Sequence, residues 1–112
     1  MKRTVIAISL ALALAAPAAA GTSRHLTIRK TSAGVRGAIH AAAPCYADQL
    51  VKVQRKTSSG WKTVAKTRTN DEGRYRKAVT LRSGKRYRTL APRNVVGSTT
   101  CLRTVSDGTV TG

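Results

Sequence analysis

Two of the four acidic side chains in this chain, Asp71 and Glu72, are neighbours, and paired carboxylates could perform acid–base or metal chemistry. Acid–base catalysis needs carboxyl groups that converge on one substrate, whereas adjacent residues point apart. A Ca²⁺ site needs roughly six to eight oxygen ligands, and only Asp48 and Asp107 remain as acids. Asn and Gly flank the pair, and both favour turns. We therefore predict that residues 70–73 form a hairpin connection without a chemical role.

The two histidines, His25 and His40, are the other candidates for catalytic bases. No Ser or Cys occurs in a pattern typical of an activated nucleophile, and two histidines with two separated cysteines do not match a zinc-ligand spacing. Gly84-Lys85 lacks the upstream Gly and the following Ser or Thr of a phosphate-binding loop. We expect both histidines at the surface, and we predict no catalytic residues, no metal site and no cofactor.

Cys45 and Cys101 are the only cysteines, so a single intramolecular pairing exists. In an oxidising compartment we expect a disulfide, with two free thiols or an intermolecular bridge as alternatives. In the chain-entropy model such a bridge stabilises the folded state by roughly 4 kcal/mol, which is comparable to the net stability of a small domain.

Residues 1–20 have the layout of a secretory signal peptide. Lys2 and Arg3 precede an apolar run over residues 5–14, and small residues over 18–20 form a cleavage site. The run is shorter than the roughly 20 residues of a membrane span, so we expect cleavage after Ala20, with an uncleaved anchor as the alternative. The expected product is extracellular and has no membrane span. It is a single domain over residues 21–112 with an ordered core over about 24–106.

Short runs of alternating apolar and polar residues, separated by turn signals at roughly 8–12-residue spacing, predict about seven strands. This pattern is typical of an all-β sandwich, here carrying one disulfide. A disordered basic chain is the alternative suggested by low aliphatic content and high charge, but the alternation argues against it. The predicted core residues are Val51, Val53, Trp61, Val64, Tyr75, Val79 and Tyr87.

Trp61 and Val64 are three residues apart, so strict alternation cannot point both side chains inward. Either Trp61 precedes the regular strand or a β-bulge lies between the two residues. We expect both to be buried, because this chain has few large apolar side chains. Lys77 shares a face with Tyr75 and Val79, and its stem must reach solvent at the sheet margin.

The segment over residues 34–101 resembles a module of secreted bacterial, especially actinobacterial, proteins: the immunoglobulin-like, transthyretin-like or carboxypeptidase-regulatory-like β-sandwich. The matching pieces are Val51-x-Val53-Gln54-Arg55, Trp61-x-x-Val64-Ala65, Thr69-x-x-x-Gly73-x-Tyr75 and Gly84-x-x-Tyr87-Arg88. The resemblance implies a single immunoglobulin-like sandwich that serves as a spacer, stalk or binding platform. It supplies no catalytic residues.

The formal net charge is +17, and residues 21–112 alone carry nineteen basic side chains against four acidic ones, a net of +15. Solubility asks for a net charge of only about 2 to 8 in a small domain, so the excess points to a polyanionic partner. Alternation turns the arginines beside Tyr75 and Tyr87 outward if both tyrosines are core residues. The predicted polyanion-binding residues are Lys62, Lys66, Arg68, Arg74, Arg76, Arg86 and Arg88.

We therefore predict a non-catalytic binding or envelope-associated module that binds an anionic envelope polymer or glycan. Nucleic acid is less well supported, because base stacking needs exposed aromatic rings and only Tyr46 is a candidate. The alternative is a structural or protein-partner domain, inhibitor-like or effector-like, that uses the loop over residues 91–100 and is only incidentally basic. A membrane-active peptide is disfavoured because no amphipathic helix is visible.

Overall fold

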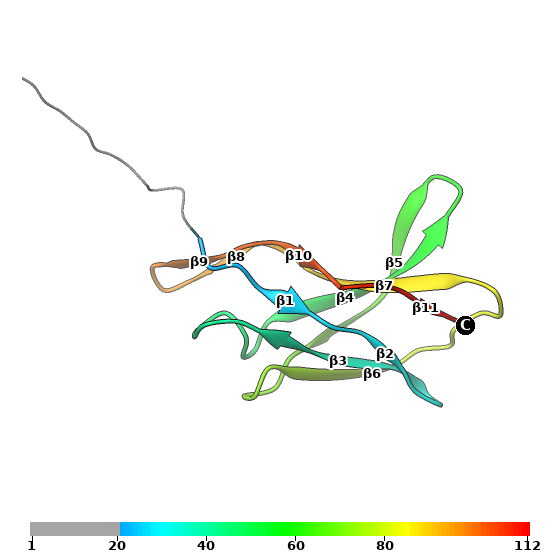
Figure 1. Cartoon of the computed structure of the whole chain (residues 1–112), viewed down its shortest axis with the longest axis horizontal. Helices are drawn as coiled ribbons and strands as arrows, with labels where there is room; N and C mark the ends of the chain where they lie inside the picture. Colours follow the sequence, from blue (N-terminus) through cyan, green and yellow to red (C-terminus); the bar gives the residue numbers. More distant parts are fainter. Residues whose placement is uncertain (1–20) are drawn as a thin grey trace, which may run out of the picture.

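The structure, a computed structural model, describes residues 21–112, which form an all-β arrangement of antiparallel sheets (Figure 1). The predicted signal peptide, residues 1–20, lies outside the described residues. Residues 21–112 contain no helix with the length and apolar character needed to cross a membrane.

The described residues contain eleven short strands, more than the seven predicted. The strands are β1 (His25–Leu26), β2 (Arg29–Lys30), β3 (Gly34–His40), β4 (Leu50–Thr57), β5 (Gly60–Arg68), β6 (Arg74–Ala78), β7 (Arg86–Ala91), β8 (Asn94–Val96), β9 (Thr99–Cys101), β10 (Thr104–Val105) and β11 (Val110–Thr111). The number is higher because edge strands are interrupted and because residues 94–101 form an additional hairpin. Strands β1 and β2 both pair with β3, β10 and β11 both pair with β7, and β8 pairs with β9.

Two sheets carry most of the structure. In the first sheet, β3 is central, with β1 and β2 along one side and β6 along the other. In the second sheet, β4 lies between β5 and β7, and β10 and β11 continue beyond β7. The chain passes from the second sheet to the first between β5 and β6, and returns between β6 and β7.

One hydrophobic core lies between the two sheets. Its members from the first sheet are Leu26, Val35, Ile39 and Tyr75, and those from the second are Val51, Val53, Tyr87 and Ala91. The burial of Val51, Val53, Tyr75 and Tyr87 agrees with the prediction from alternation. Because the inner faces share this core, the outer faces of the two sheets point in opposite directions into solvent.

The other three predicted core residues are less buried than expected. Val64 and Val79 are partly buried and pack against the core. Trp61 is partly exposed and lies outside the core, so its prediction as a core residue is wrong. Trp61 pairs with Lys56 near the tip of the β4–β5 hairpin, which stands clear of the first sheet in Figure 1, so no second layer covers it there.

A β-bulge interrupts β5 at Val64. The β4–β5 register shifts between Val53, which pairs with Ala65, and Gln54, which pairs with Thr63, and this leaves Val64 as the extra residue. A bulge was one of the two ways, left open by the sequence, in which both Trp61 and Val64 could point inward, but this bulge leaves Trp61 outside the core. It places Trp61 on the outer face of the sheet together with Gln54.

The disulfide and the acidic turn are both confirmed. Cys45 and Cys101 are bonded, with their Cα atoms 5.4 Å apart, and this bond links the β3–β4 connection to the end of β9. In the turn over residues 70–73, Asn70 Oδ1 accepts hydrogen bonds from the backbone N–H groups of Glu72 and Arg74, both at 2.9 Å. Gly73 closes the turn with a φ of +82°, a conformation that suits glycine.

The segment over residues 91–100 is not the irregular loop that the sequence suggested. It contains the β8–β9 hairpin, in which Asn94 pairs with Cys101 and Val96 with Thr99. Gly97, with a φ of +63°, allows the tight turn between the two strands. The hairpin is therefore held to the rest of the fold by a covalent bond, since Cys101 forms the disulfide with Cys45.

Candidate functional site

Charge is distributed unevenly between strands and connections. The four acidic residues, Asp48, Asp71, Glu72 and Asp107, all lie outside the strands. Among the described residues, the ion pairs are Asp107 with His25 at 2.7 Å, Asp48 with Arg68 at 2.9 Å and Glu72 with Arg74 at 3.7 Å. The strands of the two sheets therefore carry lysines and arginines without any carboxylate of their own.

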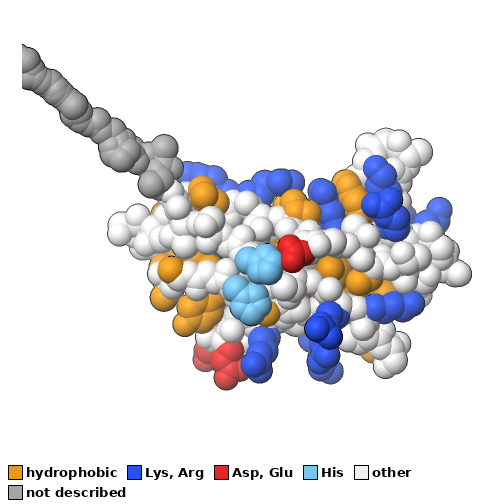
Figure 2. Space-filling model, in the orientation of Figure 1, with side chains coloured by type: hydrophobic (Ala, Val, Ile, Leu, Met, Phe, Trp, Pro, Cys, Tyr) orange, Lys and Arg blue, Asp and Glu red, His pale blue; other side chains and the backbone are white. Residues whose placement is uncertain are grey.

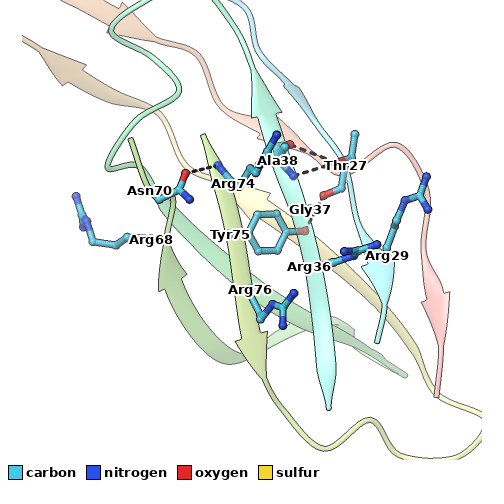
Figure 3. A pocket seen from close by; sticks show the side chains of 10 residues that line it. All are labelled: Thr27, Arg29, Arg36, Gly37, Ala38, Arg68, Asn70, Arg74, Tyr75 and Arg76. Carbon is cyan, nitrogen blue, oxygen red and sulfur yellow. Dashed lines mark hydrogen bonds between the residues drawn. The ribbon is translucent and has the colours of Figure 1, made fainter. Parts of the chain in front are cut away.

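Three arginines lie side by side on the outer face of the first sheet. Arg29 of β2 is directly opposite Arg36 of β3, and Arg36 is directly opposite Arg76 of β6. Directly opposed residues of antiparallel strands share a face, and neighbouring strands are about 4.8 Å apart, so the three Cα positions span about 10 Å. All three side chains are exposed. We call Arg29, Arg36 and Arg76 the arginine row (Figure 3).

The alternation of β3 and β6 creates this row. Val35 and Ile39 are buried, which turns Arg36 outward, and buried Tyr75 turns Arg74 and Arg76 outward. Like charges directly opposite each other in a sheet are destabilising, typically by a few tenths of a kcal/mol to about 1 kcal/mol. The row therefore costs folding stability and supplies a concentrated positive charge.

A depression of about 600 Å³ lies on this face. Its lining consists of Thr27, Arg29, Arg36, Gly37, Ala38, Arg68, Asn70, Arg74, Tyr75 and Arg76 (Figure 3). Five of these residues are arginines, and none is acidic. The side chain opposite Arg74 is only that of Ala38, which leaves the surface low between the arginines.

Buried Tyr75 holds the edge strand that carries Arg29. Its hydroxyl donates a hydrogen bond to the carbonyl oxygen of Thr27 at 2.6 Å and lies 3.1 Å from Thr89 Oγ1. Burial raises the pKa of Tyr75 to about 12, so the phenol remains a donor at neutral pH. Thr27 Oγ1 in turn accepts a hydrogen bond from the N–H of Ala38 at 3.0 Å, and the edge strand is fixed beside β3.

The structure divides the predicted polyanion-binding residues between two surfaces. Arg74 and Arg76 lie on the first sheet, while Arg86 and Arg88 lie on β7 of the second sheet. The single working surface expected from these four residues is therefore wrong, because β6 and β7 follow each other in sequence but belong to different sheets. Lys62, Lys66 and Arg68 lie on β5, also in the second sheet, and of these three only Arg68 lines the depression.

Sequence reasoning missed Arg29 and Arg36. The alternation of β3 does turn Arg36 outward, and this signal was visible in the sequence. Alternation assigns a face within one strand, but it does not say which strands are neighbours. The register between β2, β3 and β6 was needed to bring the three arginines together.

The remaining candidates lie apart from the arginine row. His25 and His40 are exposed as expected, with ring centroids 5.9 Å apart. Tyr46, expected to be an exposed ring, is partly buried against the core. Among residues 21–112, no group of three or more His, Cys, Asp or Glu side chains converges as metal ligands do.

Comparisons of this chain with protein-family models, with curated proteins and with solved structures gave no significant match. The chemistry of the arginine row is therefore the best guide to function. A guanidinium group is planar, stays charged, and presents N–H donors in a fork that fits phosphate, sulfate and carboxylate oxygens.

Proposed function

We propose that this protein is a secreted, non-catalytic module whose arginine row binds an anionic polymer, such as an envelope polymer or an anionic glycan. The observation that carries this proposal is the direct opposition of Arg29, Arg36 and Arg76 on three adjacent strands. No carboxylate lines the depression around them. An anion bound between these side chains would relieve their mutual repulsion and gain charge-assisted hydrogen bonds.

Export and an immunoglobulin-like sandwich are part of the same proposal. The signal-peptide pattern of residues 1–20 and the disulfide between Cys45 and Cys101 support export. Two antiparallel sheets that share one core support the sandwich. On this reading the sandwich is a rigid support that presents the arginine row to a polymer outside the cell.

The ligand's backbone charges, rather than flat rings, provide the recognition. Tyr75 is 4% exposed, and its hydroxyl is engaged with Thr27, so it offers no stacking surface in the depression. Trp61 belongs to the other sheet. A polymer of phosphate, sulfate or carboxylate groups fits this face better than single-stranded nucleic acid, whose binding relies on stacking.

A matched-charge comparison tests the proposal. The variant R29Q/R36Q/R76Q removes the row, and the control R82Q/K85Q/R93Q removes the same three charges from exposed positions elsewhere. In about 0.15 M salt, where the Debye length is about 8 Å, a sulfated heparin-type oligosaccharide and inorganic polyphosphate serve as probes in titration calorimetry. We expect affinity to fall at least about tenfold in the row variant and by less than about threefold in the control.

Two results would contradict the proposal that the arginine row binds an anionic polymer. Equal losses in the two variants would mean that net charge alone drives binding. Absence of binding by the unsubstituted protein to either probe would remove the polyanion proposal altogether.

The second candidate is a protein-partner domain, and one observation favours it. Among the described residues, Val95 on the β8–β9 hairpin is the large hydrophobic side chain that is most exposed, at 55%. A partner held there would lose affinity in Val95→Ser while the binding of polyphosphate stayed unchanged. The arginine row favours the first candidate, because one exposed valine is common on protein surfaces.

A further inference from the structure

A second set of cations lies on the outer face of the second sheet. Lys52 of β4 is directly opposite Lys66 of β5, and Lys56 is directly opposite Trp61. On the other side of β4, Gln54 is directly opposite Arg88 of β7. Since alternate residues of a strand share a face, these side chains all point away from the core. We call Lys52, Lys56, Trp61, Lys66 and Arg88 the tryptophan face.

Trp61 organises the positive charge on this face. The guanidinium carbon of Arg88 lies 4.5 Å from the centroid of the indole ring, and Lys56 Nζ lies 5.7 Å from it, both within the range of cation–π contacts. Arg88 Nε also donates a hydrogen bond to Gln54 Oε1 at 2.8 Å. Burial, and then the positive charge of Arg103, lower the pKa of Arg88.

No acidic residue of the described chain neutralises this face. The strands β4, β5 and β7 contain no Asp or Glu, and none of the three ion pairs in residues 21–112 involves a member of the tryptophan face. The directly opposed pair Lys52 and Lys66 repeats, with lysines, the like-charge opposition of the arginine row.

The two basic faces point in opposite directions. The core separates the arginine row from the tryptophan face, and face-to-face sheets pack about 10 Å apart. Figure 2 shows lysine and arginine side chains along both the upper and the lower margins of the molecule. An anionic group held between the arginines of the row therefore does not contact the tryptophan face, although Arg68 at the end of edge strand β5 borders the depression of the row.

We propose that the tryptophan face is a second binding surface for the same class of polyanion, so that one molecule bridges two polymer chains. This inference rests on the proposed function, because it assumes that the arginine row binds the first chain. The second surface is the weaker one: its lysines are point charges without the forked geometry of arginine, and Arg88 is already engaged with Trp61 and Gln54. Two linked sites per molecule would cross-link long polymers into a network.

Light scattering during titration with long-chain inorganic polyphosphate tests the bridge. The unsubstituted protein should scatter most at an intermediate ratio of protein to polymer and redissolve when polymer is in excess. In the variant K52Q/K66Q/R88Q, scattering should fall at least about fivefold, while the affinity for a short polyphosphate, set by the arginine row, should change by less than about threefold. The control R82Q/K85Q/R93Q, with the same loss of charge from exposed positions outside both surfaces, should scatter like the unsubstituted protein.

A second variant, K52Q/K66Q, keeps Arg88 and its contact with Trp61, and should show an intermediate loss of scattering even if R88Q disturbs the hairpin. Equal scattering by K52Q/K66Q/R88Q and the control would overturn the bridging proposal. Binding of short polyphosphate without any scattering by the unsubstituted protein would also overturn it while leaving the proposed function intact. Absence of binding would instead contradict the proposed function itself.

Discussion

At the scale of single residues, Tyr75 connects the hydrophobic core to the sheet face that carries the arginine row. Its ring lies between the sheets, and its hydroxyl bonds to Thr27 of the first sheet's edge and approaches Thr89 of the second sheet. The same residue therefore links the two layers and fixes the edge strand that carries Arg29. The phenol is neutral when it makes these contacts, which makes them sensitive to alkaline pH.

The dependence of folding stability on alkaline pH should report the titration of the Tyr75 phenol. Because the pKa of Tyr75 is raised to about 12 in the folded state against about 10 when unfolded, the unfolded chain releases its proton first, and stability falls as pH rises from 10 towards 12. Between about pH 9 and about pH 11, the titration of Tyr75 lowers the free energy of unfolding by about 1 kcal/mol. Tyr75→Phe should be less stable at pH 7 by about 1 to 3 kcal/mol, because two buried oxygens lose their partner.

Urea denaturation at about pH 9 and about pH 11 measures the free energy of unfolding of Tyr75→Phe and of the unsubstituted protein. The loss of unfolding free energy between the two pH values should be smaller in Tyr75→Phe than in the unsubstituted protein by about 1 kcal/mol. An identical loss in the two proteins would mean that the Tyr75 phenol does not titrate differently in the folded state.

At the scale of strands, the site depends on how closely β3 approaches its edge neighbour. Gly37 faces Tyr75, and a Cβ atom at Gly37 would lie 2.0 Å from the carbonyl oxygen of Thr27 and 2.6 Å from the Tyr75 hydroxyl. The absent side chain at Gly37 makes room for the hydrogen bond between Tyr75 and Thr27. Gly37 therefore positions the edge strand, and with it Arg29.

The substitution Gly37→Ala should destabilise the fold by at least about 2 kcal/mol, because backbone atoms on two strands would have to move apart. Gly108→Ala is the matched control: no atom lies within 4 Å of its Cβ position, and a change within about 0.5 kcal/mol is expected. Thermal and chemical unfolding of both variants provides the measurement. A Gly37→Ala variant as stable as the control would show that the edge strand is not packed in this way.

Comparison of the sequence patterns with these strands shows where sequence reasoning succeeds. Alternation identified the inward-facing residues Val51, Val53, Tyr75 and Tyr87, because burial follows a period of two along a strand. Trp61 and Val64 lie on opposite faces, as alternation requires for residues three apart, and the expectation that both are buried was the error. The bulge at Val64 determines that Val64, and not Trp61, packs against the core. A bulge leaves only an ambiguous spacing in the sequence, so its location requires the register of the partner strand.

The site was less predictable than the core, for a related reason. Arg74 and Arg76 were expected to face solvent, and they do. Their neighbour Arg36 lies 40 residues earlier than Arg76 in the chain, and only the pairing of β3 with β6 brings the two together. Non-local strand pairing is not encoded in the local periodicity of either strand.

At the scale of the whole molecule, charge and fold are arranged in layers. The apolar core occupies the space between the sheets, the acidic residues lie in the connections, and lysines and arginines lie on both outer faces. Self-repulsion among so many cations costs stability, and the disulfide between Cys45 and Cys101 offsets part of this cost. A domain built only for solubility would not need opposed arginines on adjacent strands.

The most direct measurement of the central claim is an NMR titration that observes the arginine Nε–Hε signals individually. A short polyphosphate, too short to cross-link, is added stepwise to the labelled protein. The account predicts that Arg29, Arg36 and Arg76 shift first and furthest, with Arg88 following only at higher concentrations. Shifts of equal size across all arginines, including exposed Arg82, Arg86 and Arg93, would contradict it, because they would show that the polymer responds to total charge and not to the arginine row.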